Sequence, residues 1–227
     1  MFVGHLAVAL KARSVEPKVP LGAAVAAAFG LDLLWPLLLL GGVEAVRVQP
    51  GDTAFTNLAF ESYPWSHSLL MALVWSIGVG ALAGRVFRSR RTGGILGLLV
   101  LSHWVLDFVT HRPDLPLWPG GAVYGLGLWN SIWATIALEG GLLVTGLALY
   151  LGRTAARDRV GSLGLYGLVA LCTLLWVSGP WAPPPPSATA VAWGALILWL
   201  LPPWSRWADQ HRVAKRAPQQ AIATDAS

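Results

Sequence analysis

Three side chains that can bind a divalent cation follow one another at helical spacing in the segment LSHWVLDFVTH. His103, Asp107 and His111 recur at every fourth residue, so a helix would present all three on one face. Imidazole and carboxylate groups together form a ligand set for zinc or manganese. An H-x-x-x-D pair on successive turns of a helix can contribute two ligands to one ion. The spacing therefore predicts a metal-binding helix.

Further histidines and carboxylates lie in or beside apolar segments, where an ionised side chain is costly. They are His5, Asp32, His67 and Glu139. No Lys or Arg lies inside the same segments, so the acids must be protonated, hydrogen-bonded or neutralised by a bound cation. Taken singly, each residue has an alternative role in helix capping or in packing between helices. Together they favour one shared metal site, with Glu139 as a ligand or as the general base.

These residues belong to a chain whose composition is typical of an integral membrane protein. Of its 227 residues, 55% are hydrophobic and 12% are charged, against about 25% charged residues in soluble domains. Six apolar segments approach or exceed the roughly 20 residues that cross a bilayer: 21–41, 67–84, 94–111, 129–151, 161–179 and 188–202. We predict an all-α, polytopic membrane helix bundle of about six transmembrane helices, with a short N-terminal helix before them. Residues 1–207 would form one membrane domain, and 208–227 a polar cytoplasmic tail.

Basic residues are concentrated in alternate connections between the apolar segments, which predicts the orientation of the chain. The basic connections are 11–18, 85–91, 153–159 and 206–216. Because cytoplasmic loops collect Lys and Arg, both termini should lie in the cytoplasm, with 42–66, 112–128 and 180–187 outside. This distribution accounts for the net charge of +5 without a nucleic-acid partner. The single cysteine, Cys172, excludes an intramolecular disulfide and a cysteine-based metal site.

The rise of a helix gives each polar residue an approximate depth below the cytoplasmic surface. His111 and His67 come out near 25 and 27 Å, toward the outer surface, so the site should open outward. A helix rising from the first basic cluster carries His5 only about 9 Å deep, unless the N-terminal segment is re-entrant. Four residues fall in one layer about 14–21 Å deep: Asp32, His103, Asp107 and Glu139.

Four short motifs together resemble the YdjM-like inner-membrane metal-dependent hydrolase family: Gly4-His5, an Asp inside the first long span, His67-Ser68, and the string SHWVLDFVT from Ser102 to Thr110. The resemblance covers about the first half of the chain, and the S-H-x-x-x-D-x-x-T string is its most specific part. It implies a multi-pass protein of a bacterial-type inner membrane with the metal ligands His5, Asp32, His67, His103 and Asp107.

Two departures from the family pattern change the expected ligand count. The family commonly has a D-x-D pair where this chain has Asp32-Leu33-Leu34, and an H-R-G-x-T-H-S string where this chain has SYPWSHS. Glu139 or His111 could replace a missing ligand, or the chain could bind one ion where its relatives bind two.

The resemblance and the ligand set together predict a metal-dependent hydrolase. A divalent metal, zinc or else manganese, would activate water against an amphiphilic, lipid-like or phosphoester substrate that enters from the outer leaflet. Glu139 would move the proton if it is not a ligand. Two alternatives stay open: an ion- or proton-coupled transporter, and a metal-stabilised membrane subunit without enzymatic activity. The substrate, the number of ions and the oligomeric state are not determined by the sequence.

Overall fold

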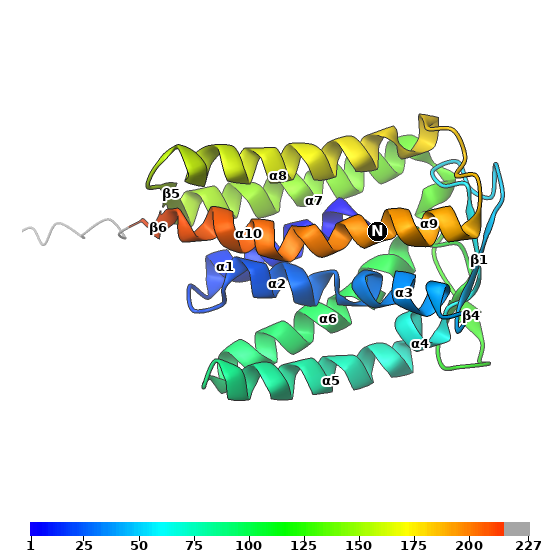
Figure 1. The fold of residues 1–227 in the computed structure, drawn as a ribbon, viewed down its shortest axis with the longest axis horizontal. Coiled ribbons are helices and arrows are strands. Elements are labelled where there is room, and N and C mark those ends of the chain that lie inside the picture. The colour runs from blue at the N-terminus through cyan, green and yellow to red at the C-terminus, as the bar shows by residue number, and fades with distance from the viewer. Residues whose placement is uncertain (216–227) are drawn as a thin grey trace, which may run out of the picture.

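The computed structural model describes residues 1–215, and helices make up most of this part of the chain (Figure 1). The α-helices are α1 (Val3–Val15), α2 (Leu21–Ala28), α3 (Gly30–Leu40), α4 (Pro64–His67), α5 (Leu69–Val86), α6 (Arg90–Thr110), α7 (Ile132–Arg153), α8 (Arg159–Ser178), α9 (Ala188–Ala195) and α10 (Leu201–Gln210). Short 3-10 helices are η1 (Leu128–Asn130), η2 (Gly179–Trp181) and η3 (Leu196–Leu200).

Three two-stranded antiparallel ladders lie in the connections and at the end of the described chain. The first pairs β1 (Ala45–Val48) with β2 (Leu58–Ser62), and the second pairs β3 (Leu115–Pro116) with β4 (Val123–Tyr124). The third pairs β5 (Thr154–Ala156) with β6 (Arg212–Ala214). The first two ladders lie near the end of the bundle that carries α4 and α9, and the third lies at the opposite end (Figure 1).

The predicted membrane spans correspond closely to these helices. Within the described residues, five helices are long and apolar enough to cross a membrane, or six if the bent pair of α2 and α3 counts as one span. The all-α membrane bundle with a short N-terminal helix is therefore confirmed. The last span is longer than predicted, because α9, η3 and α10 follow one another as one helical segment from Ala188 to Gln210.

Side-chain caps explain where many of the long helices begin. A side-chain oxygen accepts a hydrogen bond from a backbone amide inside the first turn, which satisfies a donor that the helix itself cannot pair. The capping residues of α5, α6, α7, α8 and α9 are Ser68, Ser89, Ser131, Asp158 and Ser187. The local sequence thus fixes the starts of these helices independently of their tertiary contacts.

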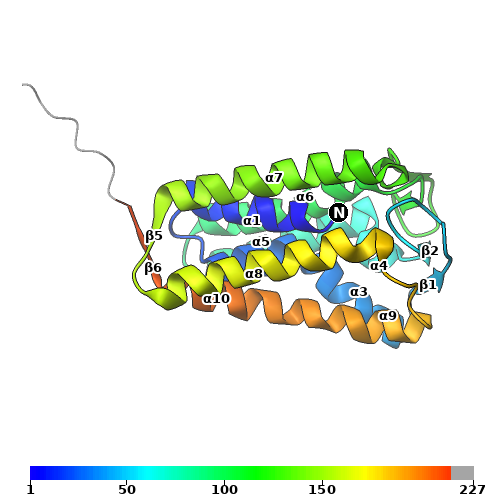
Figure 2. The same cartoon turned by 90° about the horizontal axis from the view of Figure 1, so that it is seen from above.

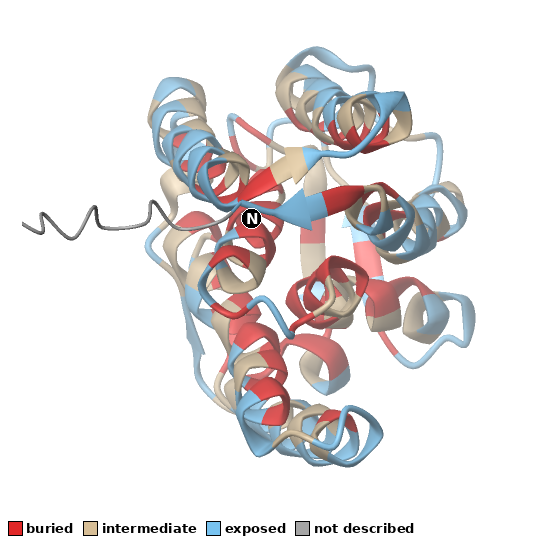
Figure 3. Cartoon of the chain, turned by 90° about the vertical axis from the view of Figure 1, so that its left-hand side faces the viewer, coloured by how far each residue is buried: buried red, intermediate tan, exposed pale blue. Residues whose placement is uncertain are grey.

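The helix α6 is more deeply buried than the other long spans, and α5 lies at the periphery. In the most apolar 18-residue stretch of each helix, half of the residues of α6 are buried, against 11% of those of α5. Buried positions face the centre of the bundle, and exposed positions face outward (Figure 3). The exposed faces remain strongly apolar, as in Ile77 and Val144, which is the pattern expected for helices that contact lipid. The residues of α6 that are predicted to bind a cation, His103 and Asp107, therefore lie deep inside the protein.

The first helix, α1, runs inside the bundle and packs against α7 and α2 (Figures 1 and 2). Eight of its residues are buried, including His5. Its first residue, Met1, lies among the helices (Figure 2), and its last turn reaches the end of the bundle where β5 and β6 pair (Figure 1). This helix places His5 in the buried interior of the bundle, which the depth estimate from the sequence had allowed only for a re-entrant segment.

The predicted polar tail begins within ordered structure. Its first residues complete α10 and form β6, and the Arg212 side chain donates hydrogen bonds to Thr154 and to the carbonyl of Gly161. The remainder of the predicted tail, 216–227, lies outside the described residues.

Candidate metal centre

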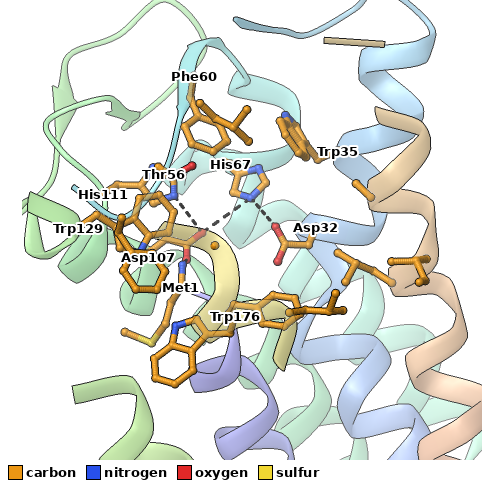
Figure 4. Close-up of a pocket in the computed structure, with 18 residues that line it drawn as sticks. Met1, Asp32, Trp35, Thr56, Phe60, His67, Asp107, His111, Trp129 and Trp176 are labelled. Carbon is orange, nitrogen blue, oxygen red and sulfur yellow. Dashed lines mark hydrogen bonds and ion pairs between the residues drawn. The ribbon is translucent and has the colours of Figure 1, made fainter. Parts of the chain in front are cut away.

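Histidine and aspartate side chains from four separate segments meet in the interior of the bundle. Two groups of ligand atoms each lie within 4.8 Å of one another. The first group joins His5 of α1 to His103 and Asp107 of α6, and the second joins Asp32 of α3 and His67 of α4 to the same His103. Figure 4 shows Asp32, His67 and Asp107 pointing toward one another. The five residues that the family resemblance named as ligands therefore come together in one cluster.

His103 belongs to both groups, and its hydrogen bonding leaves a ring nitrogen free. Its Nδ1 donates to the backbone carbonyl of Ala28 at 2.7 Å, so a neutral ring carries its lone pair on the Nε2 atom. That Nε2 atom lies 3.1 Å from Asp107 Oδ2 and 3.6 Å from Asp32 Oδ1, yet it forms no hydrogen bond. In that form the ring directs its lone pair toward two carboxylates, an arrangement suited to a cation.

His5 stacks on His103, with ring centroids 3.8 Å apart and an angle of 5° between the planes. Its Nε2 atom lies 3.2 Å from Asp107 Oδ1, while its Nδ1 atom is buried without a partner. The α-ammonium group of Met1 also contacts Asp107 Oδ1. This ammonium group places a positive charge beside Asp107, although no Lys or Arg lies in the apolar segments.

His67 lies closer to the cluster than its estimated depth suggested. The second predicted span starts at 67, but α5 begins at Leu69, and His67 ends the separate short helix α4. Its Nε2 atom lies 3.5 Å from Asp32 Oδ1 and 3.8 Å from Asp107 Oδ2. The turn between α4 and α5 directs this ring inward, which a single continuous helix would not have done.

His111 lies at the edge of the cluster, just beyond the last residue of α6. Its Nε2 atom is 4.0 Å from Asp107 Oδ2, and its Nδ1 atom is 3.0 Å from Asp114 Oδ1. Tyr63 also donates a hydrogen bond to Asp114. Burial alone would raise the pKa of the Asp114 carboxyl, but hydrogen bonds from His111, Tyr63 and Arg112 outweigh it and lower that pKa. The ionised Asp114 thus holds the His111 ring in place.

Asp114 is a residue that the sequence analysis missed. A signal was available, because Asp114 follows His111 by three residues and a carboxylate near a histidine often orients the ring. It was overlooked because the intervening Arg112 and Pro113 mark the end of the helix, so helical spacing could not be assumed.

Glu139 contacts the start of α1 instead of joining either ligand group. Its Oε2 atom accepts hydrogen bonds from the backbone amides of Phe2, at 2.8 Å, and Gly4, at 3.4 Å. Its Oε1 atom is buried without a partner. A carboxylate at a helix N-terminus satisfies amides that lack an intrahelical acceptor. Glu139 therefore holds in place the segment that carries His5.

A cavity of about 360 Å³ adjoins the cluster and is mainly apolar. Asp32, His67, Asp107 and His111 line its polar side. Aromatic residues shape the remaining wall, and Figure 4 shows several of them around the carboxylates: Trp35, Phe55, Phe60, Trp129 and Trp176. The connection before His67 contributes Thr56 and Leu58 to the lining. A ligand with one polar and one apolar part would match this lining.

Two apolar residues that line the cavity are also exposed on the surface of the bundle. Leu175 of α8 and Ile197 of η3 both line it, and their side chains are 41% and 45% exposed. In a membrane such residues face hydrocarbon. The cavity lining therefore includes both buried carboxylates and residues that are exposed on the apolar surface of the bundle.

The fold and the cluster define a polytopic helical membrane protein with buried histidine and aspartate groups that could bind a metal ion. The family model of the YdjM inner membrane protein matches residues 64–182, and the chain belongs to that family. His67, His103, Asp107, His111 and Glu139 lie inside the matched range, whereas His5 and Asp32 precede it. Comparison with curated proteins and with solved structures finds no match.

Proposed function

We propose that this protein is a metal-dependent hydrolase of the inner membrane, acting on a lipid-like ester or phosphoester. The observation that carries the proposal is the buried Nε2 atom of His103, which has no hydrogen-bond partner and faces Asp107 and Asp32 at one side of an amphiphilic cavity. Two aspartates packed against histidines in an apolar interior would be costly to keep only for structural reasons.

His103, Asp107, Asp32, His67 and His5 would bind one or two divalent cations, with zinc first and manganese second on the basis of the donor types. A cation bound there would supply Lewis-acid chemistry, activating water and polarising a phosphoryl or acyl oxygen. His111 would bind as a further ligand or orient the polar part of the substrate, because its Nε2 atom faces Asp107 and it lines the cavity.

The aromatic wall would hold the apolar part of the substrate and exclude water from the carboxylates. Entry between Leu175 and Ile197 would let a lipid reach the cluster from within the bilayer, without leaving hydrocarbon. The shape of the cavity supports an amphiphilic substrate over a small ion in transit, for which an apolar chamber of this kind has no use.

Glu139 keeps its proposed role as the general base because its Oε1 atom is buried and unpaired. Its other oxygen already holds the amides of Phe2 and Gly4. A carboxylate anchored at one oxygen and free at the other is able to accept a proton without losing its position.

The predicted orientation is also retained as a proposal. The basic connections 85–91 and 153–159 lie at one end of the bundle, together with β5 and β6, and the ladder of β1 and β2 lies at the other (Figure 1). The excess of Lys and Arg supports a cytoplasmic position for the first end. The cluster would then open toward the outer leaflet.

Metal analysis of the purified protein, followed by incubation of the metal-loaded form with lipid mixtures, tests the proposal. We expect at least about one equivalent of transition metal per chain, lost in His103→Ala and Asp107→Ala, and cleaved lipid detected by mass spectrometry. A metal content that both variants leave unchanged would overturn the assignment of the centre. Bound metal with transport into proteoliposomes and no cleavage would overturn the hydrolase.

A further inference from the structure

A buried carboxylate outside the cluster is connected to His67 through a single hydroxyl group. The Oε2 atom of Glu44 accepts a hydrogen bond from Ser66 Oγ at 2.7 Å, and Ser66 Oγ lies 2.7 Å from His67 Nδ1. Glu44 is 5% exposed, and Ser66 is fully buried. Glu44 lies in the connection between α3 and β1, so this contact joins two distant parts of the chain.

The direction of each hydrogen bond in this chain follows from the chemistry of the groups. A serine hydroxyl has one proton to donate. Because the Glu44 carboxylate can only accept, the Ser66 hydroxyl donates its hydrogen bond to Glu44. Ser66 Oγ must then accept from His67, so the proton of the His67 ring lies on Nδ1. The Nε2 atom consequently presents its lone pair toward Asp32 and Asp107, which is the form that binds a metal.

The other histidines on the same side of the cluster are oriented by a comparable device. His103 Nδ1 donates to the carbonyl of Ala28, and His111 Nδ1 contacts the carboxylate of Asp114. In each case an acceptor outside the cluster fixes the proton on Nδ1. For His67 the equivalent acceptor is Ser66 Oγ, and its hydrogen bond to Glu44 fixes the direction in which the hydroxyl group donates.

We propose that Glu44 and Ser66 are positioning residues that fix the tautomer of His67 for metal binding. The inference rests on the proposed metal centre. A purely structural role for Glu44 is the competing explanation, because its Oε1 atom also accepts from the backbone amides of Trp65 and Ser66, both at 2.8 Å. We call the two hydrogen bonds that join Glu44 to His67 through Ser66 Oγ the relay. The experiment must change the relay while leaving the contact of Glu44 with the backbone of α4 in place.

Glu44→Gln meets that requirement. The glutamine carbonyl can keep the two backbone amides, while its NH2 group donates to Ser66 Oγ. Ser66 can then donate its own proton to His67 Nδ1, which at 2.7 Å is a closer acceptor than the carbonyl of Tyr63 at 3.4 Å, and the ring proton moves to Nε2. Ser66→Ala removes the relay and leaves Glu44 with its backbone contacts, whereas Ser66→Thr retains a hydroxyl group.

The chain offers a close control for the serine. Ser102 precedes His103 as Ser66 precedes His67, but Ser102 Oγ donates to the carbonyl of Leu99 and not to the neighbouring ring. Ser102→Ala should therefore leave metal binding unchanged. Glu61→Gln is the control for the carboxylate, because Glu61 is exposed on β2 and pairs with Arg47 at the surface.

Two measurements test the proposal on the full chain in detergent. Zinc titration should show affinity reduced about 10–100-fold in Glu44→Gln and Ser66→Ala, with Ser66→Thr near wild type. Nitrogen-15 NMR of metal-free protein labelled at histidine should show the His67 proton on Nδ1 in the wild type and on Nε2 in Glu44→Gln.

The outcomes separate this inference from the proposed function. If the wild type binds no zinc, the proposed metal centre fails, whatever the NMR spectra show. If the wild type binds zinc and both relay variants match it in affinity, or if His67 carries its proton on Nε2 in the wild type, the positioning role of Glu44 and Ser66 is overturned.

Discussion

His5 of α1 and His103 of α6 stack face to face, with ring centroids 3.8 Å apart. The stack joins the first helix of the chain to the central one, and both rings face the carboxylate of Asp107. Because His103 belongs to both groups of ligand atoms and His5 to one, the two histidines should contribute unequally to metal binding.

Substitution of these two histidines tests the inequality. We expect His103→Ala to abolish tight zinc binding and His5→Ala to weaken it by about tenfold or more, since the second ligand group remains intact in the latter. Isothermal titration of detergent-solubilised protein measures both affinities. An equal loss of zinc affinity in His5→Ala and His103→Ala would contradict the predicted inequality. His211→Ala provides the control, because His211 lies outside the cluster.

Gly146 of α7 should be essential for the position of His5, although it is not a ligand. A β-carbon at this position would lie 2.9 Å from the Ala7 Cα atom, so α1 would have to move away from α7. We expect Gly146→Val to destabilise the protein by about 1–3 kcal/mol and to lower zinc affinity.

Gly141 provides a control on the same helix, because a β-carbon there would meet no atom within 4 Å. Gly141→Val should leave thermal stability and zinc affinity close to those of the wild type. Equal behaviour of the two variants would contradict the close approach of α1 and α7.

Filling the cavity should block lipid binding without removing the metal. Ala195 lines the cavity, whereas a β-carbon on the neighbouring Gly194 would face open space. We expect Ala195→Phe to suppress labelling of residues around Leu175 and Leu198 by a photoactivatable phospholipid, while Gly194→Phe preserves it. Zinc content should be unchanged in both. Labelling that is insensitive to Ala195→Phe would argue against lateral entry.

Chemical labelling of single cysteines should test the orientation. Ala122 and Ala156 are both exposed, and they lie in connections at opposite ends of the bundle. With the buried Cys172 replaced, a membrane-impermeant maleimide should label Ala122→Cys in intact cells and Ala156→Cys only after permeabilisation. The reverse pattern would invert the proposed orientation.

The contact between Asp158 and His211 should make stability depend weakly on pH. A hydrogen bond from His211, together with the backbone amide of Gly161, lowers the pKa of the Asp158 carboxyl. The ionised carboxylate therefore stabilises the fold above its ordinary pKa of about 3.9, and this contribution is lost as the pH falls through the lower folded-state pKa.

Asp158→Ala should accordingly lower the melting temperature slightly at pH 7, and the difference from the wild type should shrink below about pH 4. Thermal unfolding in detergent over this pH range measures the effect. Because Asp158 is exposed, a large difference in melting temperature would indicate a contact other than this one.

The sequence alone determined the helical membrane architecture and the H-x-x-x-D pair of α6. Both depend on short-range regularities: an apolar run has the length of a bilayer, a serine or aspartate starts a helix, and His103 and Asp107 share a face because of the helical repeat. The remaining candidate ligands were indicated by their place in or beside apolar segments, and the family motifs named three of them again: His5, Asp32 and His67. Neither signal showed how these side chains contact one another.

Only the tertiary structure decided which of these groups are neighbours. Burial of α1 against α7 brings His5 to His103, and the separate turn of α4 directs His67 inward. The contacts of Met1 with Asp107 and of Glu139 with the first amides also depend on that burial. Such contacts arise from the complementary shapes of segments distant in the chain, and no local spacing specifies them.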